Sequence, residues 1–288
     1  MSNRTIDFNM KKIRTNCVEG QFYPDNSKEQ IAIFRHALES EKSKIEYDLA
    51  SKTIIGGVVP HAGHVYCAKE AIHFFEVVKA SREKYDVIIL INPSHRGSGF
   101  AASIDEHSYW TTSLGEIKLD EDLANIIGLP FDSRSQAKEH SAEVIIPYIQ
   151  YFLGNDIPFL PINFYAQNNE SAKIIAQDIF NACKQQKKRA LIIASSDFNH
   201  FATPQKGEVL DNYALDALIN DEPEEFEKRI REKDISICGF GAILVLYYFS
   251  KLNVGSFDIK ILNRGHSGEV YPSESVVDYI SMLFYKDY

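Results

Sequence analysis

The chain has 288 residues, enough for one large α/β domain or two small ones, and 44% of them are hydrophobic, as in ordinary globular proteins. Its formal net charge of -9 argues against a nucleic-acid-binding protein, which would normally carry a basic surface. No apolar run approaches the roughly 18 residues of a membrane-spanning helix, so we expect no transmembrane helix in this chain.

The N-terminal residues Met1 to Asn16 lack the continuous apolar stretch of a signal peptide. The four cysteines stand far apart without a Cys-x-x-Cys pair, so the sequence indicates neither a disulfide framework nor a zinc ribbon. They are Cys17, Cys67, Cys183 and Cys238. A reducing cytoplasm is the location that fits this pattern.

Apolar, β-branched runs predict strands at residues 53–60, 86–92, 158–163, 189–195 and 257–263. Their nearly unbroken hydrophobicity is typical of strands that are covered on both faces. Between the first two, and again between the third and fourth, apolar residues recur at helical spacing. Cys67 and Cys183 fall on these apolar helix faces, so we expect both thiols to be buried.

Further helices are predicted at residues 139–152, where Pro147 would end or kink the helix, and at 239–251. Residues 206–233 indicate two helices that separate near Glu222 and Pro223, while 275–285 predict a strand or a helix. Strands alternating with helices predict an α/β fold with a mostly parallel central sheet flanked by helices. Because no repeat or linker divides the chain, we expect one domain, residues 1–288.

Two histidines follow predicted strands directly. His61 lies in Pro-His-Ala-Gly after the first strand, and His95 lies in Asn-Pro-Ser-His after the second. In an open α/β sheet the carboxyl ends of the strands line the ligand crevice. A single histidine there is more often a loop residue, but two from neighbouring strand ends form half of a transition-metal site.

Asp197 and His200 follow the predicted strand 189–195 in the same setting. A carboxylate three residues from a histidine can orient the ring and raise its basicity for proton transfer. The alternative is that Asp197 caps the next segment while His200 only packs in the turn.

Cys238 precedes Gly239 at the start of an apolar helix, where the helix dipole favours a thiolate. It is therefore the best candidate for a reactive or metal-binding cysteine, unless it is merely a small buried residue. His140 begins another helix and either reaches the crevice as a hydrogen-bond donor or lies exposed. The remaining histidines without supporting context are expected to be structural or exposed: His36, His73, His107 and His266.

Taken together, these motifs resemble the Memo family, also called AmmeMemoRadiSam system protein B. The resemblance runs in order along nearly the whole chain, and each matching segment alone is short. The segments are residues 20–24 (Gly-Gln-Phe-Tyr-Pro), 59–63 (Val-Pro-His-Ala-Gly), 92–95 (Asn-Pro-Ser-His), 110–115 (Trp-Thr-Thr-Ser-Leu-Gly), 139–143 (Glu-His-Ser-Ala-Glu), 195–200 (Ser-Ser-Asp-Phe-Asn-His), 238–241 (Cys-Gly-Phe-Gly) and 275–279 (Ser-Val-Val-Asp-Tyr).

The resemblance implies a fold like that of the class III extradiol dioxygenases, in which two histidines and a carboxylate hold Fe(II). Carried over by motif, His61 and His95 would be ligands, and Cys238 would replace the carboxylate. His200, with Asp197 beside it, would match the acid/base histidine. A thiolate suits iron, copper or zinc, and it is oxidisable, so ring-opening chemistry does not follow from the fold. His64 stands where the family more often has an aromatic residue.

Three functions compete. The first is metal-dependent redox or dioxygenase-like chemistry, with Fe(II) ahead of copper or zinc as the cofactor. The second is a thiol-dependent hydrolase or transferase in which Cys238 attacks, His200 is the base and Asp197 orients it. The third is a binding protein that reuses the crevice for a small molecule or a peptide. The family name implies radical-SAM and AMMECR-type partner proteins.

Overall fold

A computed structural model describes residues 11–97 and 99–287 of the chain. Its central sheet has the strand order β10-β11-β2-β8-β3-β7-β4, and β9 pairs with β11 off this path. The four inner strands are mutually parallel, as the sequence predicts, and all four were expected from their apolar runs. They are β2 (Thr53–Val59), β8 (Ala190–Ser195), β3 (Val87–Pro93) and β7 (Phe159–Phe164).

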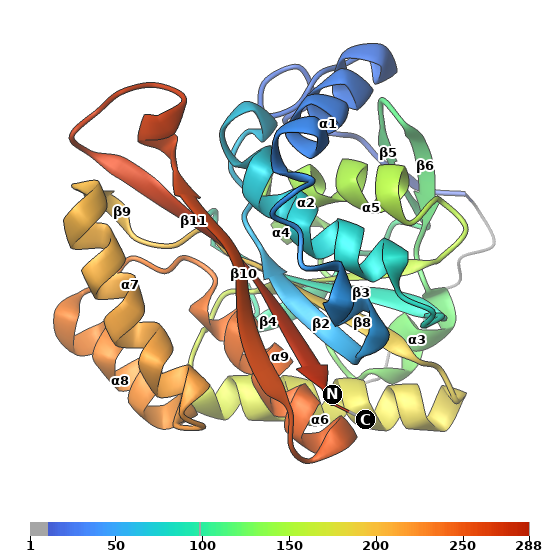
Figure 1. Cartoon of the computed structure of the whole chain (residues 1–288). Coiled ribbons are helices and arrows are strands. Elements are labelled where there is room, and N and C mark those ends of the chain that lie inside the picture. Colours follow the sequence, from blue (N-terminus) through green and yellow to red (C-terminus); the bar gives the residue numbers. More distant parts are fainter. Residues whose placement is uncertain (1–10, 98, 288) are drawn as a thin grey trace.

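The outer strands are antiparallel, so the sheet is mixed rather than mostly parallel throughout. The last predicted segment is a strand, β11, which forms a hairpin with β10 and inserts beside β2 (Figure 1). A hairpin joins its two strands directly and needs no crossover helix, which is why the alternation of strands and helices ends here. The outer strands are β10 (Asp258–His266), β11 (Val276–Lys286), β4 (Ala102–Ile104) and β9 (His200–Ala202).

Helices cover both faces of the sheet (Figure 1). One face is covered by α2 (His64–Ala80) and α5 (Ile146–Phe152), with α1 (Ser27–Glu41) packed on top of α2. The other face is covered by α3 (Glu121–Ile126), α6 (Asn169–Gln186) and α9 (Phe240–Val254). Alternate residues of β3 serve the two cores: Ile89 belongs to one and Leu90 to the other. This explains the unbroken apolar runs of the inner strands. Cys67 and Cys183 are buried, as expected.

Residues 206–233 do form two helices, α7 (Pro204–Ile219) and α8 (Pro223–Lys233). The prediction for 139–152 was wrong in one respect. Pro147 occupies the first turn of α5, which begins at Ile146 after a short 3-10 helix (Glu143–Ile145), because a proline lacks only an N–H that would be unpaired there anyway. Residues 139–142 are therefore loop.

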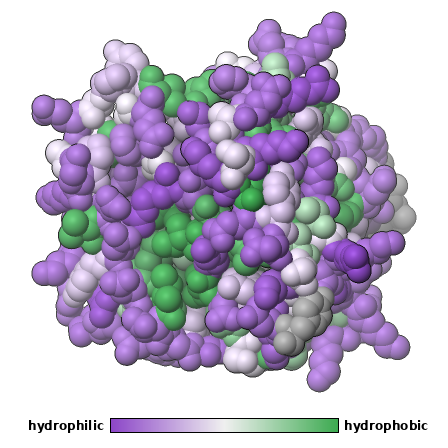
Figure 2. Space-filling model, in the orientation of Figure 1, coloured by the Kyte–Doolittle hydropathy of each residue, from purple (hydrophilic) through white to green (hydrophobic). Residues whose placement is uncertain are grey.

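Elements that the sequence did not single out include a small sheet of β1 (Ile13–Arg14), β5 (Tyr109–Thr112) and β6 (Gly115–Lys118). The sequence also did not single out α1, α3, β4 and β9, nor α4 (Ser133–Gln136) and two 3-10 helices (Tyr47–Ser51 and Ser267–Glu269). Figure 2 shows a largely hydrophilic surface on the face in view, interrupted by separate hydrophobic areas. Within the described residues, every helix is too short or too polar to cross a membrane.

Candidate metal centre

His61 is fixed at the end of β2 by two contacts from the end of β8. Its backbone N–H donates to Asp197 Oδ1 at 2.8 Å, and its ring Nδ1 lies 2.8 Å from Ser195 Oγ. The Ser195 hydroxyl already donates its hydrogen to the carbonyl of Ser141 at 2.6 Å, so Nδ1–H must be the donor to Ser195. This leaves Nε2 of His61 without a hydrogen and available to a metal ion.

Glu139 fixes His95 in a similar way at the end of β3. The Glu139 Oε2 atom accepts the backbone N–H of His95 at 2.6 Å, and Oε1 lies 2.9 Å from ring Nδ1. Burial raises the pKa of this fully buried acid, but the contacts from His95 and the N–H of Ser141 outweigh it and leave the pKa at about 2. An ionised carboxylate therefore accepts Nδ1–H and leaves Nε2 of His95 free, as in many metal-binding histidines.

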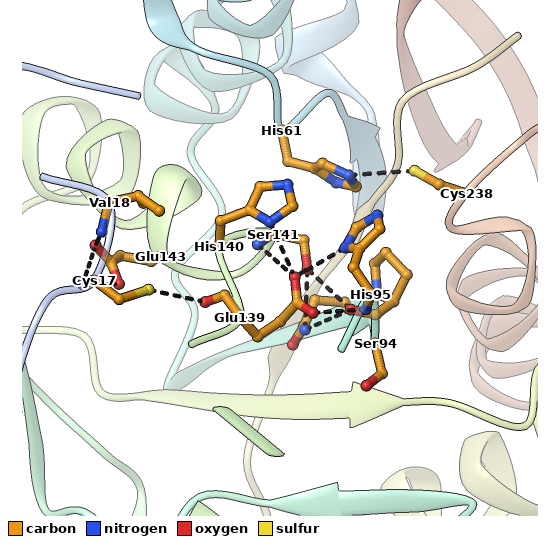
Figure 3. A network of polar contacts seen from close by, with 12 residues as sticks. Cys17, Val18, His61, Ser94, His95, Glu139, His140, Ser141, Glu143 and Cys238 are labelled. Carbon is orange, nitrogen blue, oxygen red and sulfur yellow. Dashed lines mark hydrogen bonds and ion pairs between the residues drawn. The ribbon is translucent and has the colours of Figure 1, made fainter. Parts of the chain in front are cut away.

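His140 brings a third imidazole to the same place (Figure 3). Its ring centre lies 4.7 Å from that of His95 and 5.5 Å from that of His61. One ligand atom from each of the three residues lies within 4.8 Å of the others. His140 Nδ1 also lies 3.3 Å from Glu139 Oε1, so a single carboxylate orients two of the rings.

The two more buried imidazoles of this His cluster (His61, His95 and His140) are neutral. Burial lowers the pKa of His61 well below its usual value, and protonation of a neighbouring histidine would lower it further. Burial also lowers the pKa of His140 to about 4, against the opposing pull of Glu139. Neutral imidazole is the form that binds metals, so the donor set fits a transition-metal ion.

Cys238 approaches the His cluster from the loop before α9. Its Sγ lies 3.2 Å from Nε2 of His61 and accepts the backbone N–H of Asp197 at 3.2 Å (Figure 3). The expectation of a thiolate favoured by the helix dipole was wrong for the metal-free thiol. Burial, followed by the nearby charge of Asp197, raises the pKa of Cys238 far above its usual range.

Asp197 lies in the segment between β8 and β9 and His200 begins β9, but the two side chains bind different partners. Asp197 binds the backbone of His61, and burial raises its pKa to about 6. His200 Nδ1 lies 2.8 Å from the carbonyl oxygen of Ser236, which can only accept, so Nδ1–H donates and Nε2 is free. The group that orients the His200 ring is therefore Ser236, where we expected Asp197.

His64 lies away from the His cluster in the core beneath α1. It is 1% exposed, and its Nε2 donates to the carbonyl of Val144 at 2.7 Å. Burial lowers its pKa to about 4. It therefore neither reaches the mouth of the site nor faces solvent. Among the other histidines, His73 pairs with Glu41 at 3.3 Å, His107 pairs with Asp105 at 2.8 Å and His36 is exposed.

Sequence reasoning placed Glu139 in a motif but assigned it no role, and it left His140 undecided. The available signal was the Glu-His pair itself, because an acid beside a histidine can orient neighbouring imidazoles. The loop is held in place by the N-terminal segment: the side chain of Arg14 donates to the carbonyl of Glu139 at 3.0 Å, and the backbone N–H groups of Cys17 and Val18 donate to the Glu143 carboxylate.

The family model described as Memo-like protein matches residues 14–283, a range that includes every residue of this site. The chain belongs to the Memo family. A MEMO1 family protein of Methanococcoides burtonii is 32% identical over 277 residues, covering 94% of this chain and 99% of that protein. One from Thermoplasma volcanium is 33% identical and covers 94% and 98%.

Among solved structures, this Memo-family chain aligns with the uncharacterized protein JW3007 from Escherichia coli K12. That alignment has a TM-score of 0.49 and 14% sequence identity, and it covers 73% of this chain and 91% of that chain.

Proposed function

We propose that this Memo-family chain binds a divalent transition-metal ion through His61, His95 and His140, with Cys238 as a further donor. The observation that carries the proposal is the His cluster, whose three ligand atoms lie within 4.8 Å of one another. Two of the rings have Nδ1 tied to Ser195 or Glu139, which presents Nε2 to the shared space. Such support of the ligands is characteristic of built metal sites.

We further propose that the ion is Fe(II), with copper or zinc as alternatives, and that the chemistry is oxidoreductive, as in extradiol dioxygenase-like proteins. Imidazoles with one sulfur suit all three metals. A bound iron would supply redox chemistry toward a small substrate. The high pKa of Cys238 speaks against the rival thiol hydrolase, since the metal-free sulfur is protonated at neutral pH.

His200 is the proposed acid/base residue, because its Nε2 is free while Ser236 fixes the other ring nitrogen. Asp197 supports it electrostatically: its charge reaches His200, and burial holds its pKa at about 6, near neutral pH. The buried carboxyl can thus hold a proton close to the His cluster. This assigns proton movement to the loop after β8 and leaves the cluster to bind the ion.

Metal binding is tested by loading the anaerobic protein with Fe(II), Cu(II) or Zn(II), separately, and measuring bound metal after gel filtration. We expect near-stoichiometric metal in the wild type and in the surface control His36→Ala, and loss of metal in the His61→Ala, His95→Ala double variant. Equal metal content in all three proteins would refute the proposal. Single His140→Ala and Cys238→Ser variants then report which of them contributes to affinity.

Redox function is tested separately with the iron-loaded protein. We expect oxygen uptake with members of a panel of catechols, and a reduction of at least about 100-fold in His200→Gln if that residue moves protons. If the protein binds metal but takes up no oxygen with any catechol of the panel, the proposed metal site stands and the proposed dioxygenase-like activity on catechols is refuted. Binding of a peptide or of partner proteins would then be the function to examine.

A further inference from the structure

Two buried carboxyl groups face each other directly behind the His200 loop. Asp211 comes from α7 and is 0% exposed, while Asp278 comes from β11 and is 4% exposed. Their side chains interact with each other. Among the described residues, Oδ2 of each acid has no hydrogen-bond donor. Two ionised carboxylates would repel each other strongly in such a place, whereas one shared proton satisfies both oxygens.

This carboxyl pair (Asp211 and Asp278) also holds the backbone just before His200. Asp211 Oδ1 accepts the N–H of Asn199 at 3.1 Å. The backbone N–H of Asp278 donates to the carbonyl of Asn199 at 2.9 Å, and its own carbonyl accepts the N–H of Phe198 at 2.8 Å. Both sides of Asn199 are therefore fixed by the pair, and the next residue is His200.

The pair has little room to separate. Asp278 Oδ2 packs against Gly207 of α7, where even an added Cβ would overlap with the carboxyl group. The charged and titratable groups that face the pair are Arg264 and His266 of β10 and His200 of β9. One guanidinium cannot neutralise two carboxylates, and Arg264 already donates to Asn212. Burial and the charge of Asp278 raise the pKa of Asp211 to about 8, and burial raises that of Asp278.

We propose that Asp211 and Asp278 share one proton near neutral pH and that this carboxyl pair is the positioning element for His200. Loss of the proton in mild alkali leaves two adjacent buried charges and loosens the β9–β11 contact that places the imidazole. The role of His200 as acid/base residue rests on the proposed function, whereas the shared proton and the placement of the ring do not.

The test is a pH titration of the His200 imidazole by NMR on the full-length, metal-free chain, with its signal assigned through His200→Gln. The variant Asp211→Asn is the matched mimic of the protonated pair, since its amide can donate to Asp278 while its oxygen still accepts from Asn199. Asp211→Ala removes both contacts. We expect an inflection near pH 8 in the wild type, its absence in Asp211→Asn, and a displaced signal at every pH in Asp211→Ala.

The proposal fails if the wild type shows no such inflection or if Asp211→Asn keeps it. A second readout is the melting temperature. The folded pKa of Asp211 lies above its unfolded value of 3.8, so its contribution to stability is complete below that value and is lost as pH rises through about 8. Between pH 5 and pH 9 the wild type should therefore lose several degrees relative to Asp211→Asn. A constant difference between the two proteins would overturn the shared proton even if no metal is ever bound.

Discussion

The Glu139 carboxylate accepts two hydrogen bonds from His95: its Oε2 lies 2.6 Å from the backbone nitrogen, and its Oε1 lies 2.9 Å from ring Nδ1. The same carboxylate accepts the N–H of Ser141 and lies beside His140. One buried acid therefore sets the orientation of two imidazoles and the path of the loop that carries one of them. Five predictions follow from this and from the neighbouring contacts.

Replacing Glu139 by Gln should weaken metal binding by about 10- to 100-fold, because the neutral amide orients the histidines less well and lowers their basicity. Affinity is measured by competition with a chromophoric chelator. The control is Glu116→Gln, since Glu116 is 40% exposed and pairs with Lys11 at the surface. An affinity equal to that of the wild type would contradict the orienting role of Glu139.

Cys238 should resist alkylation in the metal-free protein at pH 7, because its half-buried thiol stays protonated. The test is iodoacetamide labelling followed by peptide mass spectrometry at pH 7 and pH 9, with free cysteine as the reference thiol. We expect labelling slower than that of the reference by at least about 100-fold. Rapid modification of Cys238 at pH 7 would restore the thiol hydrolase as the leading function.

The buried ion pair between Arg14 and Glu143 should contribute strongly to folding. The two side chains are 2% and 1% exposed and lie 2.6 Å apart. Arg14→Met leaves the Glu143 charge without its partner and should cost about 3–5 kcal/mol in urea unfolding at pH 7. Lys11→Met, which breaks an exposed pair, should cost less than about 1 kcal/mol.

The pair of Arg14 and Glu143 also makes the folding stability depend on pH, and the direction of that dependence can be predicted. Burial raises the pKa of Glu143, but Arg14 and the N–H groups of Cys17 and Val18 outweigh it and lower the pKa below 4.5. The stability from this carboxylate is therefore present above pH 4.5 and is lost as pH falls through the folded pKa. The stability gap between the wild type and Glu143→Gln should narrow below pH 4.5, and a gap that widens there would be contrary to this assignment.

Gly239→Ala should disturb the metal centre through the end of β8. An added Cβ would overlap with the carbonyl oxygen of Ser195 and lie 2.7 Å from Cβ of Ser196. We expect a loss of about 1–3 kcal/mol of stability together with weaker metal binding, because Ser195 orients His61. Gly99→Ala, with no atom within 4 Å of the added carbon, is the control. Equal stability and equal metal affinity in the two variants would mean that the contact of Gly239 with Ser195 and Ser196 does not need a glycine.

The inner strands could be predicted because a strand buried on both faces has an unbroken apolar sequence, as in Val87 to Ile91. The antiparallel strands were harder to identify. β11 is long and mostly buried, yet its type depends on pairing with β2, more than 200 residues away in sequence. Local residue patterns do not contain such pairings, and the parallel pairing of β1 with β5 in the small sheet is another long-range contact of this kind.

His61, His95 and Cys238 could be proposed together because each follows or precedes an element with a clear apolar pattern. Their roles as ligands stay predictions for the metal-loading experiment. His140 could not be placed from its neighbours, because its loop is held by Arg14 from the far end of the chain. The orienting partner of His200 was likewise a backbone carbonyl, at Ser236, which no side-chain motif can reveal.

β11 lies inside the sheet between β2 and β10 and also pairs with β9, although it comes after all the other described strands in sequence. The ribosome synthesises β11 after all the candidate ligand residues. Until it docks, the strand that leads to His61 lacks one neighbour and the His200 loop lacks its pairing strand. We therefore expect metal to be retained only after β11 has docked, so that nascent chains stalled before residue 276 would not retain the ion.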